Sequence, residues 1–139
     1  MKKRKSILVT SGSKRLGKKI SKFFVMNDWD LILHYNKSKI HAEETAHELS
    51  SYSNRIKLYN ADFTNYNEVN NLIENLNTLE EEWIGLINNA GFFKYDSGRD
   101  FSLEQLNNHM SVNFSVPSML TQALYKNIMK NHTKKNKNN

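Results

Sequence analysis

The residues best suited to do chemistry lie near the N-terminus, at residues 10–19 (TSGSKRLGKK). A short β-branched apolar run precedes this segment, and apolar residues at helical spacing follow it, which predicts a turn between a strand and a helix. Free N–H groups and the dipole at a helix N-terminus favour a phosphate. The turn is therefore predicted to bind a phosphate group.

Two kinds of phosphate site fit this turn incompletely. A P-loop would use Gly12, four residues and then Gly17-Lys18, but the next position should carry a magnesium-binding hydroxyl and is Lys19 instead. Asp62 is the only candidate for a magnesium-binding aspartate at a strand end. The second design is a dinucleotide-binding turn, although G-x-G-x-x-G is absent as written. A structural alternative also stands, in which Gly12 is a loop glycine and Gly17 allows close helix packing.

The apolar pattern predicts the elements that position this turn. Continuous apolar runs of strand length occur at residues 6–10, 29–35, 55–61 and 83–88, and helical stripes fall between and after them. Such alternation is typical of a parallel sheet covered on both faces, so we expect an α/β, Rossmann-type doubly wound sheet of strand order 3-2-1-4. Ligands bind at the carboxyl ends of such strands. Pro117 is expected to break or kink the last helix.

The turn sequence resembles that of a known family, the short-chain dehydrogenases/reductases (SDRs). It is similar to their threonine-glycine turn, in the variant with an arginine, Arg15 here, replacing one glycine, which is typical of pteridine reductases. Ser11 stands where the family's first glycine usually lies, and Gly12 beside it can supply flexibility.

Two further strings resemble the same family. Residues 61–64 (ADFT) are similar to its element after strand three, and residues 88–91 (NNAG) to its Asn-Asn-Ala-Gly signature after strand four. The order and spacing of these elements identify the chain as an SDR member over residues 6 to about 125, close to the first half of a typical member. Residues 1–125 are thus expected to form an incomplete NAD(P)-binding domain, and residues 126–139 a polar, basic, disordered tail.

The resemblance implies which residues contact a dinucleotide. In the family the aspartate after strand three usually bonds the adenine, which corresponds to Asp62. The expected cofactor-binding residues are Thr10, Ser11, Gly12, Lys14, Arg15, Leu16, Gly17, His34, Tyr35, Asn36, Lys37, Ser38, Asp62, Phe63, Asn89, Ala90 and Gly91.

The segment after strand two favours NADP(H) over NAD. Sites that prefer NAD usually place an acid there, and residues 31–42 contain none before Glu43. Lys37 and nearby hydroxyls would stabilise a 2′-phosphate, and residues 34–38 (HYNKS) resemble this position in NADP-using members. A solvated loop explains the lysines at 37 and 39 equally well.

The catalytic residues are expected to be incomplete. Asn113 matches the family's asparagine that holds a water in a proton relay; alternatively it caps free carbonyls near Pro117. The family's serine, tyrosine and lysine lie on strand five and the next helix, which this chain does not reach. The only Tyr-x-x-x-Lys, Tyr35 to Lys39, falls on the adenosine side, and the five histidines show no metal-ligand spacing.

We therefore expect an NADP-dependent reductase fold that is inactive alone. A complete enzyme would transfer hydride to a C=O or C=N group of a small carbonyl or pterin-like substrate. The alternatives are a non-enzymatic nucleotide-binding fragment and a gene remnant. Strand four is expected to leave an open edge, where a complementing C-terminal half or a second copy could associate.

Composition narrows the partners and location. Nine of the 20 cations of this 139-residue chain lie in residues 2–5 and 126–139, so the body pairs 11 cations with 14 acids despite a net charge of +6. A folded basic stripe is thus not expected, nor is nucleic-acid binding. Cysteine is absent and no apolar run is long enough for a signal peptide or membrane span, so a cytoplasmic protein is expected.

Overall fold

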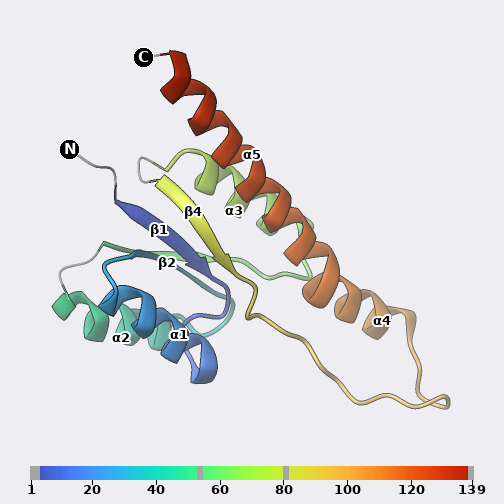
Figure 1. Cartoon of the computed structure of the whole chain (residues 1–139). Coiled ribbons are helices and arrows are strands. Elements are labelled where there is room, and N and C mark those ends of the chain that lie inside the picture. The colour runs from blue at the N-terminus through green and yellow to red at the C-terminus, as the bar shows by residue number, and fades with distance from the viewer. Residues whose placement is uncertain (1–3, 53–54, 80–81, 138–139) are drawn as a thin grey trace.

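In the computed structural model, four parallel strands form one sheet with helices on both faces (Figure 1). The structure describes residues 4–52, 55–79 and 82–137. The strand order is β3-β2-β1-β4, and every neighbouring pair is parallel, which confirms the predicted truncated Rossmann-type sheet. The strands are β1 (Lys5–Val9), β2 (Asp30–Tyr35), β3 (Ile56–Asn60) and β4 (Glu82–Ile87).

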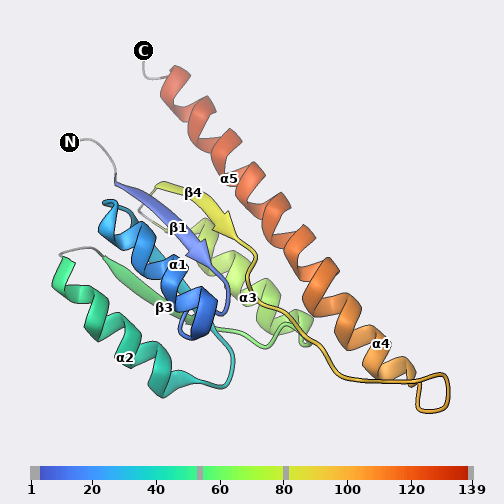
Figure 2. The ribbon, with the colours of Figure 1, turned by 60° about the horizontal axis from the view of Figure 1, so that its bottom comes forward.

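The helices divide between the two faces of the sheet (Figure 2). One layer contains α1 and α2, and the other contains α3 and α5. A single 3₁₀ turn, Ser50–Tyr52, follows α2. The helices are α1 (Arg15–Met26), α2 (Lys39–Leu49), α3 (Tyr66–Asn77), α4 (Leu103–Met110) and α5 (Val116–Lys137).

Alternation along the inner strands builds a separate apolar core on each side. Ile7 and Val9 of β1 pack with α1 and α2, whereas Leu8 between them packs with α3 and α5. All three side chains are buried. Because both faces of the strand are covered, the run has to be continuously apolar, as the sequence pattern indicated.

The long helix after β4 changes its hydrogen-bonding pattern just before Pro117 and does not break there. A π-helical turn, Ser111–Ser115, joins α4 to α5, and Pro117 is the second residue of α5. Proline lacks the N–H that an interior helix position donates, and a π-turn is one way for a helix to absorb such a local change. The expected break is thus replaced by a change in helix type.

The C-terminal segment is more regular than expected. Helix α5 continues to Lys137, so the part of the predicted tail that the structure describes is helical. Near the start of this segment, Asn127 Nδ2 donates to the carbonyl of Trp83 in β4 at 2.9 Å, which ties α5 to the sheet. Among the described residues, no helix combines the length and apolarity needed to cross a membrane.

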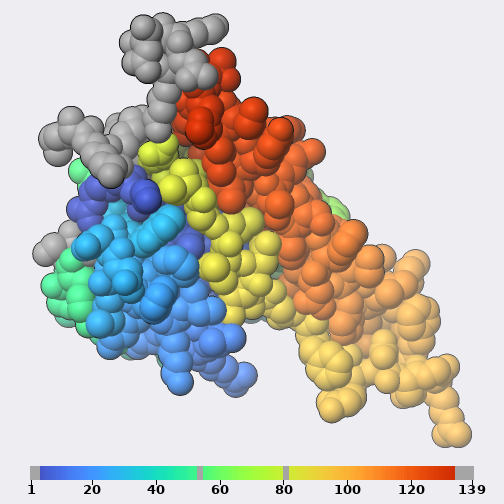
Figure 3. All heavy atoms as spheres, in the orientation of Figure 1, coloured from blue at the N-terminus to red at the C-terminus, as the bar shows by residue number. Residues whose placement is uncertain are grey.

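Strand β4 forms one edge of the sheet, as predicted. In the described part of the chain it pairs with β1 alone. The segment from residue 88 to 102 that follows it contains no helix or strand. In the space-filling view α4 and the adjoining part of this segment project from the body beyond the start of α5 (Figure 3).

Candidate functional site

The turn between β1 and α1 has the backbone of a tight phosphate-binding turn. Ser11 and Arg15 adopt left-handed φ values of 50° and 47°. The residue that precedes the helix, Lys14, makes no capping hydrogen bond with its side chain. Since the first N–H groups of a helix lack intrahelical partners, those of α1 remain available to an anion.

Gly17 is required by the close packing of this turn. A Cβ atom at this position would lie 2.1 Å from the Ser11 carbonyl oxygen and 2.6 Å from Asn89 Nδ2. Both contacts are too short for any side chain to occupy. The helix therefore approaches the turn as closely as it does only because residue 17 is glycine.

Thr10 and Asn89 join the ends of β1 and β4. The N–H groups of Asn89 and Ala90 each donate to Thr10 Oγ1 at 2.9 Å. Asn89 Nδ2 donates to the carbonyls of Thr10, at 3.1 Å, and Ser11, at 3.2 Å. The Asn-Asn-Ala-Gly motif of residues 88–91 is thus held against the turn through Asn89 and Ala90.

His34 joins the ends of β1, β2 and β3. Its Nδ1 accepts a hydrogen bond from the Ser11 N–H at 3.1 Å, and its Nε2 lies 2.9 Å from the Ala61 carbonyl. The ring stacks on Phe63, with centroids 4.1 Å apart. Burial lowers the pKa of His34 to about 4, so the ring is neutral at pH 7, with the proton on Nε2.

These elements border a continuous groove across the carboxyl ends of the strands. One cavity of about 400 Å³ lies over the turn, and another of about 450 Å³ lies over the ends of β2 and β3. Ser11 and Gly91 line both cavities, which makes the two adjoin. A groove of this kind, at the point where the connections diverge to both faces, is where doubly wound sheets bind ligands.

Most of the expected contact residues come together in this groove. Those that line it are Ser11, Lys14, Arg15, Leu16, Gly17, His34, Asn36, Lys37, Asp62, Phe63, Asn89, Ala90 and Gly91. Four others do not line it. Thr10 and Gly12 are buried behind the turn, Tyr35 packs in the core beneath α1 and α2, and Ser38 immediately precedes α2.

The groove also contains residues that were not predicted. Ala61 and Thr64 belong to the motif of residues 61–64, and Phe92 directly follows the motif of residues 88–91, so their place in the sequence could have indicated them. Asn108 and Val112 come from α4 and the π-turn. No local pattern marks these two, because the tertiary fold alone brings that helix over the end of β3.

Charge is unevenly distributed along the groove. Lys14 and Arg15 lie over the turn and Lys37 at the other end, whereas Asp62 is the only carboxylate among the described lining residues. The pKa of Asp62 is lowered mainly by a hydrogen bond from the Thr64 N–H and also by one from the Thr64 hydroxyl. Asn36 and Lys37 make smaller contributions in the same direction. The groove is thus net positive and suited to an anionic ligand.

Helix α3 begins with part of a capping box, formed by Asn65 and Glu68. Asn65 Oδ1 accepts from the N–H groups of Asn67 and Glu68, as an N-cap does. Glu68 Oε2 accepts from the N–H of Asp62 at 2.7 Å instead of returning to the cap residue's own N–H. The glutamate therefore holds the loop that carries Asp62.

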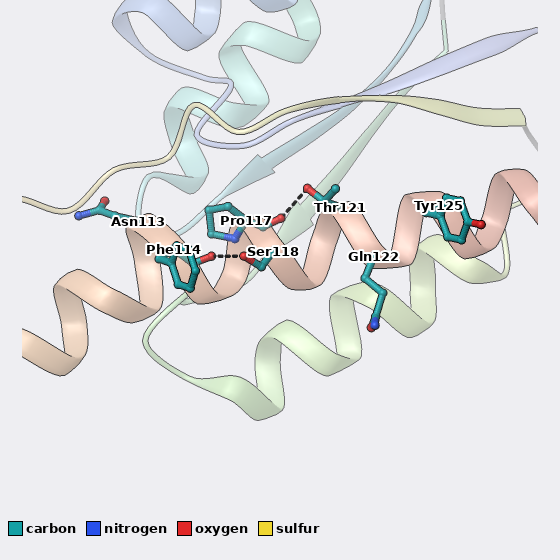
Figure 4. A pocket seen from close by; sticks show the side chains of 7 residues that line it. All are labelled: Asn113, Phe114, Pro117, Ser118, Thr121, Gln122 and Tyr125. Carbon is teal, nitrogen blue, oxygen red and sulfur yellow. Dashed lines mark hydrogen bonds between the residues drawn. The ribbon is translucent and has the colours of Figure 1, made fainter.

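Asn113 does not itself line this groove, but both ends of its amide bind Phe92, which does. Oδ1 accepts from the Phe92 N–H at 2.8 Å, and Nδ2 donates to the Phe92 carbonyl at 2.7 Å. These bonds hold the segment after β4, and both ends of the amide thus bind Phe92 and not the carbonyls near Pro117. Asn113 also borders an open hollow of about 570 Å³ along α5 (Figure 4), together with Phe114, Pro117, Ser118, Thr121, Gln122 and Tyr125.

Comparisons with known proteins agree with this architecture. A search of curated proteins finds no match. Among solved structures, a short chain dehydrogenase from Burkholderia cenocepacia J2315 in complex with NADP superposes with a TM-score of 0.81 at 27% identity, covering 89% of this chain and 50% of that one. A short-chain dehydrogenase from Sphingobium yanoikuyae in complex with NADPH gives 0.79 at 21% identity, with 86% and 46% covered.

A third neighbour is FolM alternative dihydrofolate reductase 1 from Brucella canis, complexed with NADP. It has a TM-score of 0.79 at 23% identity, with 87% of this chain and 48% of that one covered. The chain thus spans about half the length of the solved structures that it matches. The family model described as short chain dehydrogenase matches residues 5–136. Since that match extends over nearly the whole chain, the protein belongs to the short-chain dehydrogenase family.

Proposed function

We propose that this chain is the cofactor-binding half of an NADP(H)-dependent, cytoplasmic oxidoreductase. The observation that carries the proposal is the continuous groove, with an uncapped helix N-terminus at one end and Lys37 beside Asp62 at the other. An extended molecule with a phosphate near its middle and another at one end matches this distribution of donors and cations. Similar structures that contain NADP or NADPH support the same cofactor class.

Different residues of the groove would bind different parts of the dinucleotide. The N–H groups at residues 13–17 would hold the pyrophosphate, and the backbone at Asn89–Gly91 would lie along it. Asp62 and Phe63 would border the adenine. Thr10, Gly12, Tyr35 and Ser38 would act indirectly, because they do not line the groove.

NADP(H) is favoured over NAD by the charge at the end of β2. Asn36 and Lys37 line the groove there, and no carboxylate follows the strand before α2. A carboxylate at this position would bind the two ribose hydroxyls of NAD and repel a 2′-phosphate. Lys37 would instead attract the additional phosphate.

The chemistry that we propose is hydride transfer to a C=O or C=N group of a small carbonyl or pterin-like substrate. The nicotinamide supplies the hydride when the cofactor is bound. This chain's residues bind and orient the cofactor, and Asn113 holds the segment after β4 at the end of the groove. The family's serine, tyrosine and lysine are not among the 139 residues, so we propose that these residues alone bind cofactor without turnover.

The open β4 edge is the proposed place of association. A complementing C-terminal half or a second copy would pair with this strand and cover its free backbone groups. Nucleic acid and membrane are not proposed as partners. The competing proposal, a P-loop nucleoside triphosphatase, is disfavoured by Lys19, which stands where a magnesium-binding hydroxyl belongs.

A titration with NADPH and NADH tests the cofactor proposal. We expect NADPH fluorescence to change on binding, and Lys37→Glu to weaken NADPH affinity about tenfold, which corresponds to about 1.4 kcal/mol, with little effect on NADH. Lys130→Glu, an equal charge change on the exposed surface of α5, is the matched control. The absence of any fluorescence change at millimolar NADPH would reject the cofactor proposal, and magnesium-dependent ATP binding would favour the P-loop.

A further inference from the structure

We propose that His34 is a positioning residue that compensates for the serine at position 11 of the cofactor turn. It does so as a neutral imidazole that holds the Ser11 N–H from one side and the end of β3 from the other. This role is part of the proposed cofactor function, and its test by NADPH affinity rests on that function. Its test by NMR needs no cofactor.

Ser11 needs such a partner because of its backbone conformation. Its φ of 50° lies in the left-handed region, where a Cβ atom is disfavoured and glycine is not. The N–H that His34 accepts belongs to this same residue. Without that hydrogen bond, a serine would tend to return to a negative φ, and the turn that follows would move.

His34 reaches the turn by two routes. Its side chain binds the Ser11 N–H, and its backbone carbonyl accepts from the Gly12 N–H at 3.1 Å. The side chain is thus fixed relative to two consecutive residues of the turn. A change in the ring therefore acts on the turn itself and not merely on the core around it.

The remaining contacts fix the orientation of the ring. Nε2 binds the Ala61 carbonyl, and the ring stacks on Phe63, which lines the groove. Because Nε2 donates to that carbonyl, the lone pair of Nδ1 faces Ser11. His34 thereby sets the distance between the phosphate end and the adenine end of the groove.

The surroundings keep the ring in this form. The side chain is 1% exposed, and burial is the main cause of its lowered pKa. The charged group whose field reaches it is Asp62, which acts weakly in the opposite direction. A proton on Nδ1 would place two N–H groups face to face and remove the restraint on Ser11.

A double-mutant cycle on the protein tests the proposal. His34→Phe keeps an aromatic ring against Phe63 but removes both ring nitrogens, and Ser11→Gly removes the need for the restraint. We expect His34→Phe to weaken NADPH binding about tenfold in the parent and less than threefold in the Ser11→Gly background. Equal factors in the two backgrounds would overturn the inference, because His34 would then not act through Ser11.

Ser111→Ala is the matched control for a lost buried hydrogen bond. Ser111 Oγ donates to the Phe63 carbonyl at 2.5 Å but does not line the groove. We expect this variant to lose stability and keep its NADPH affinity. An equal loss of affinity in Ser111→Ala and His34→Phe would show a general effect on folding and would also overturn the inference.

Nitrogen NMR of the unmutated protein gives a test without cofactor or variants. The inference requires an unprotonated Nδ1 and a protonated Nε2 at pH 7, and a Ser11 amide that exchanges slowly with solvent. A protonated Nδ1, or rapid exchange at Ser11, would overturn it even if a variant failed to fold. If the parent binds no NADPH while these signals appear, the proposed function fails and the positioning role in the turn stands.

Discussion

Replacing Gly17 by alanine is expected to destabilise the protein and disrupt the turn. The new Cβ atom would lie 2.1 Å from the Ser11 carbonyl oxygen, so this contact must lengthen by about 0.9 Å to reach 3.0 Å, the shortest distance that Cβ atoms ordinarily keep. The obstacle is backbone and cannot rotate away. Asn89 Nδ2, at 2.6 Å, must move as well, which strains its bonds to Thr10 and Ser11.

The cost follows from these two effects. Overpacking of this kind costs about 1–3 kcal/mol, and each weakened hydrogen bond adds about 0.5–1.5 kcal/mol. With two such bonds, we expect a loss of about 2–6 kcal/mol in the free energy of unfolding, measured by urea denaturation with tryptophan fluorescence. Gly98→Ala is the control, because a Cβ atom there meets no atom within 4 Å.

Gly17→Ala also tests whether Gly17 belongs to a phosphate-binding turn or only allows close helix packing. At temperatures where Gly17→Ala remains folded, we expect NADPH affinity to fall at least tenfold, because the N–H groups of the turn move. Reduced stability with unchanged affinity would leave Gly17 as a packing residue only. A free energy of unfolding within about 0.5 kcal/mol of the parent, the range of an ordinary surface change, would refute the steric reasoning.

Two further predictions concern stability. The pKa of His34 is about 4 in the folded protein, below its ordinary value of 6.5, so the unfolded chain binds more protons between these two pH values. The contribution of His34 to the free energy of unfolding is therefore complete above pH 6.5. It declines as the pH falls toward 4, by at most about 1.4 kcal/mol per pH unit. Urea unfolding of the parent and His34→Phe between pH 7 and 5 should show a shallower slope in the variant, and parallel slopes would contradict the assignment. Asn65→Ala should lower the free energy of unfolding by about 1 kcal/mol through loss of the α3 N-cap, seen as a lower Tm, whereas Asn70→Ala on the exposed face of the same helix should not.

Site residues that local structure positions were predicted more accurately than those positioned by contacts with distant parts of the chain. Lys14, Arg15 and Gly17 line the groove as expected because the turn that presents them is local, set by residues next to one another in the chain. Tyr35 and Ser38 were grouped with Lys37 by sequence adjacency. Tyr35 does not line the groove because side chains alternate along β2, and its neighbour His34 takes the position facing the groove, whereas Ser38 lies directly before α2. Asn113 was expected near a proton relay or a cap, and its partner, Phe92, lies on a segment that folds back from a distance.

The order of the elements, the parallel sheet and the family motifs could be predicted from the amino-acid sequence, because apolar periodicity and glycine positions act over a few residues. Three features depend on contacts between distant residues or elements: Ser11 takes a left-handed conformation held by His34, Glu68 supports Asp62, and a π-turn precedes Pro117. Each of these depends on a hydrogen bond or packing contact whose partner is chosen by geometry. The amino-acid sequence indicates which polar groups need hydrogen-bond partners, and the tertiary structure determines which groups become those partners.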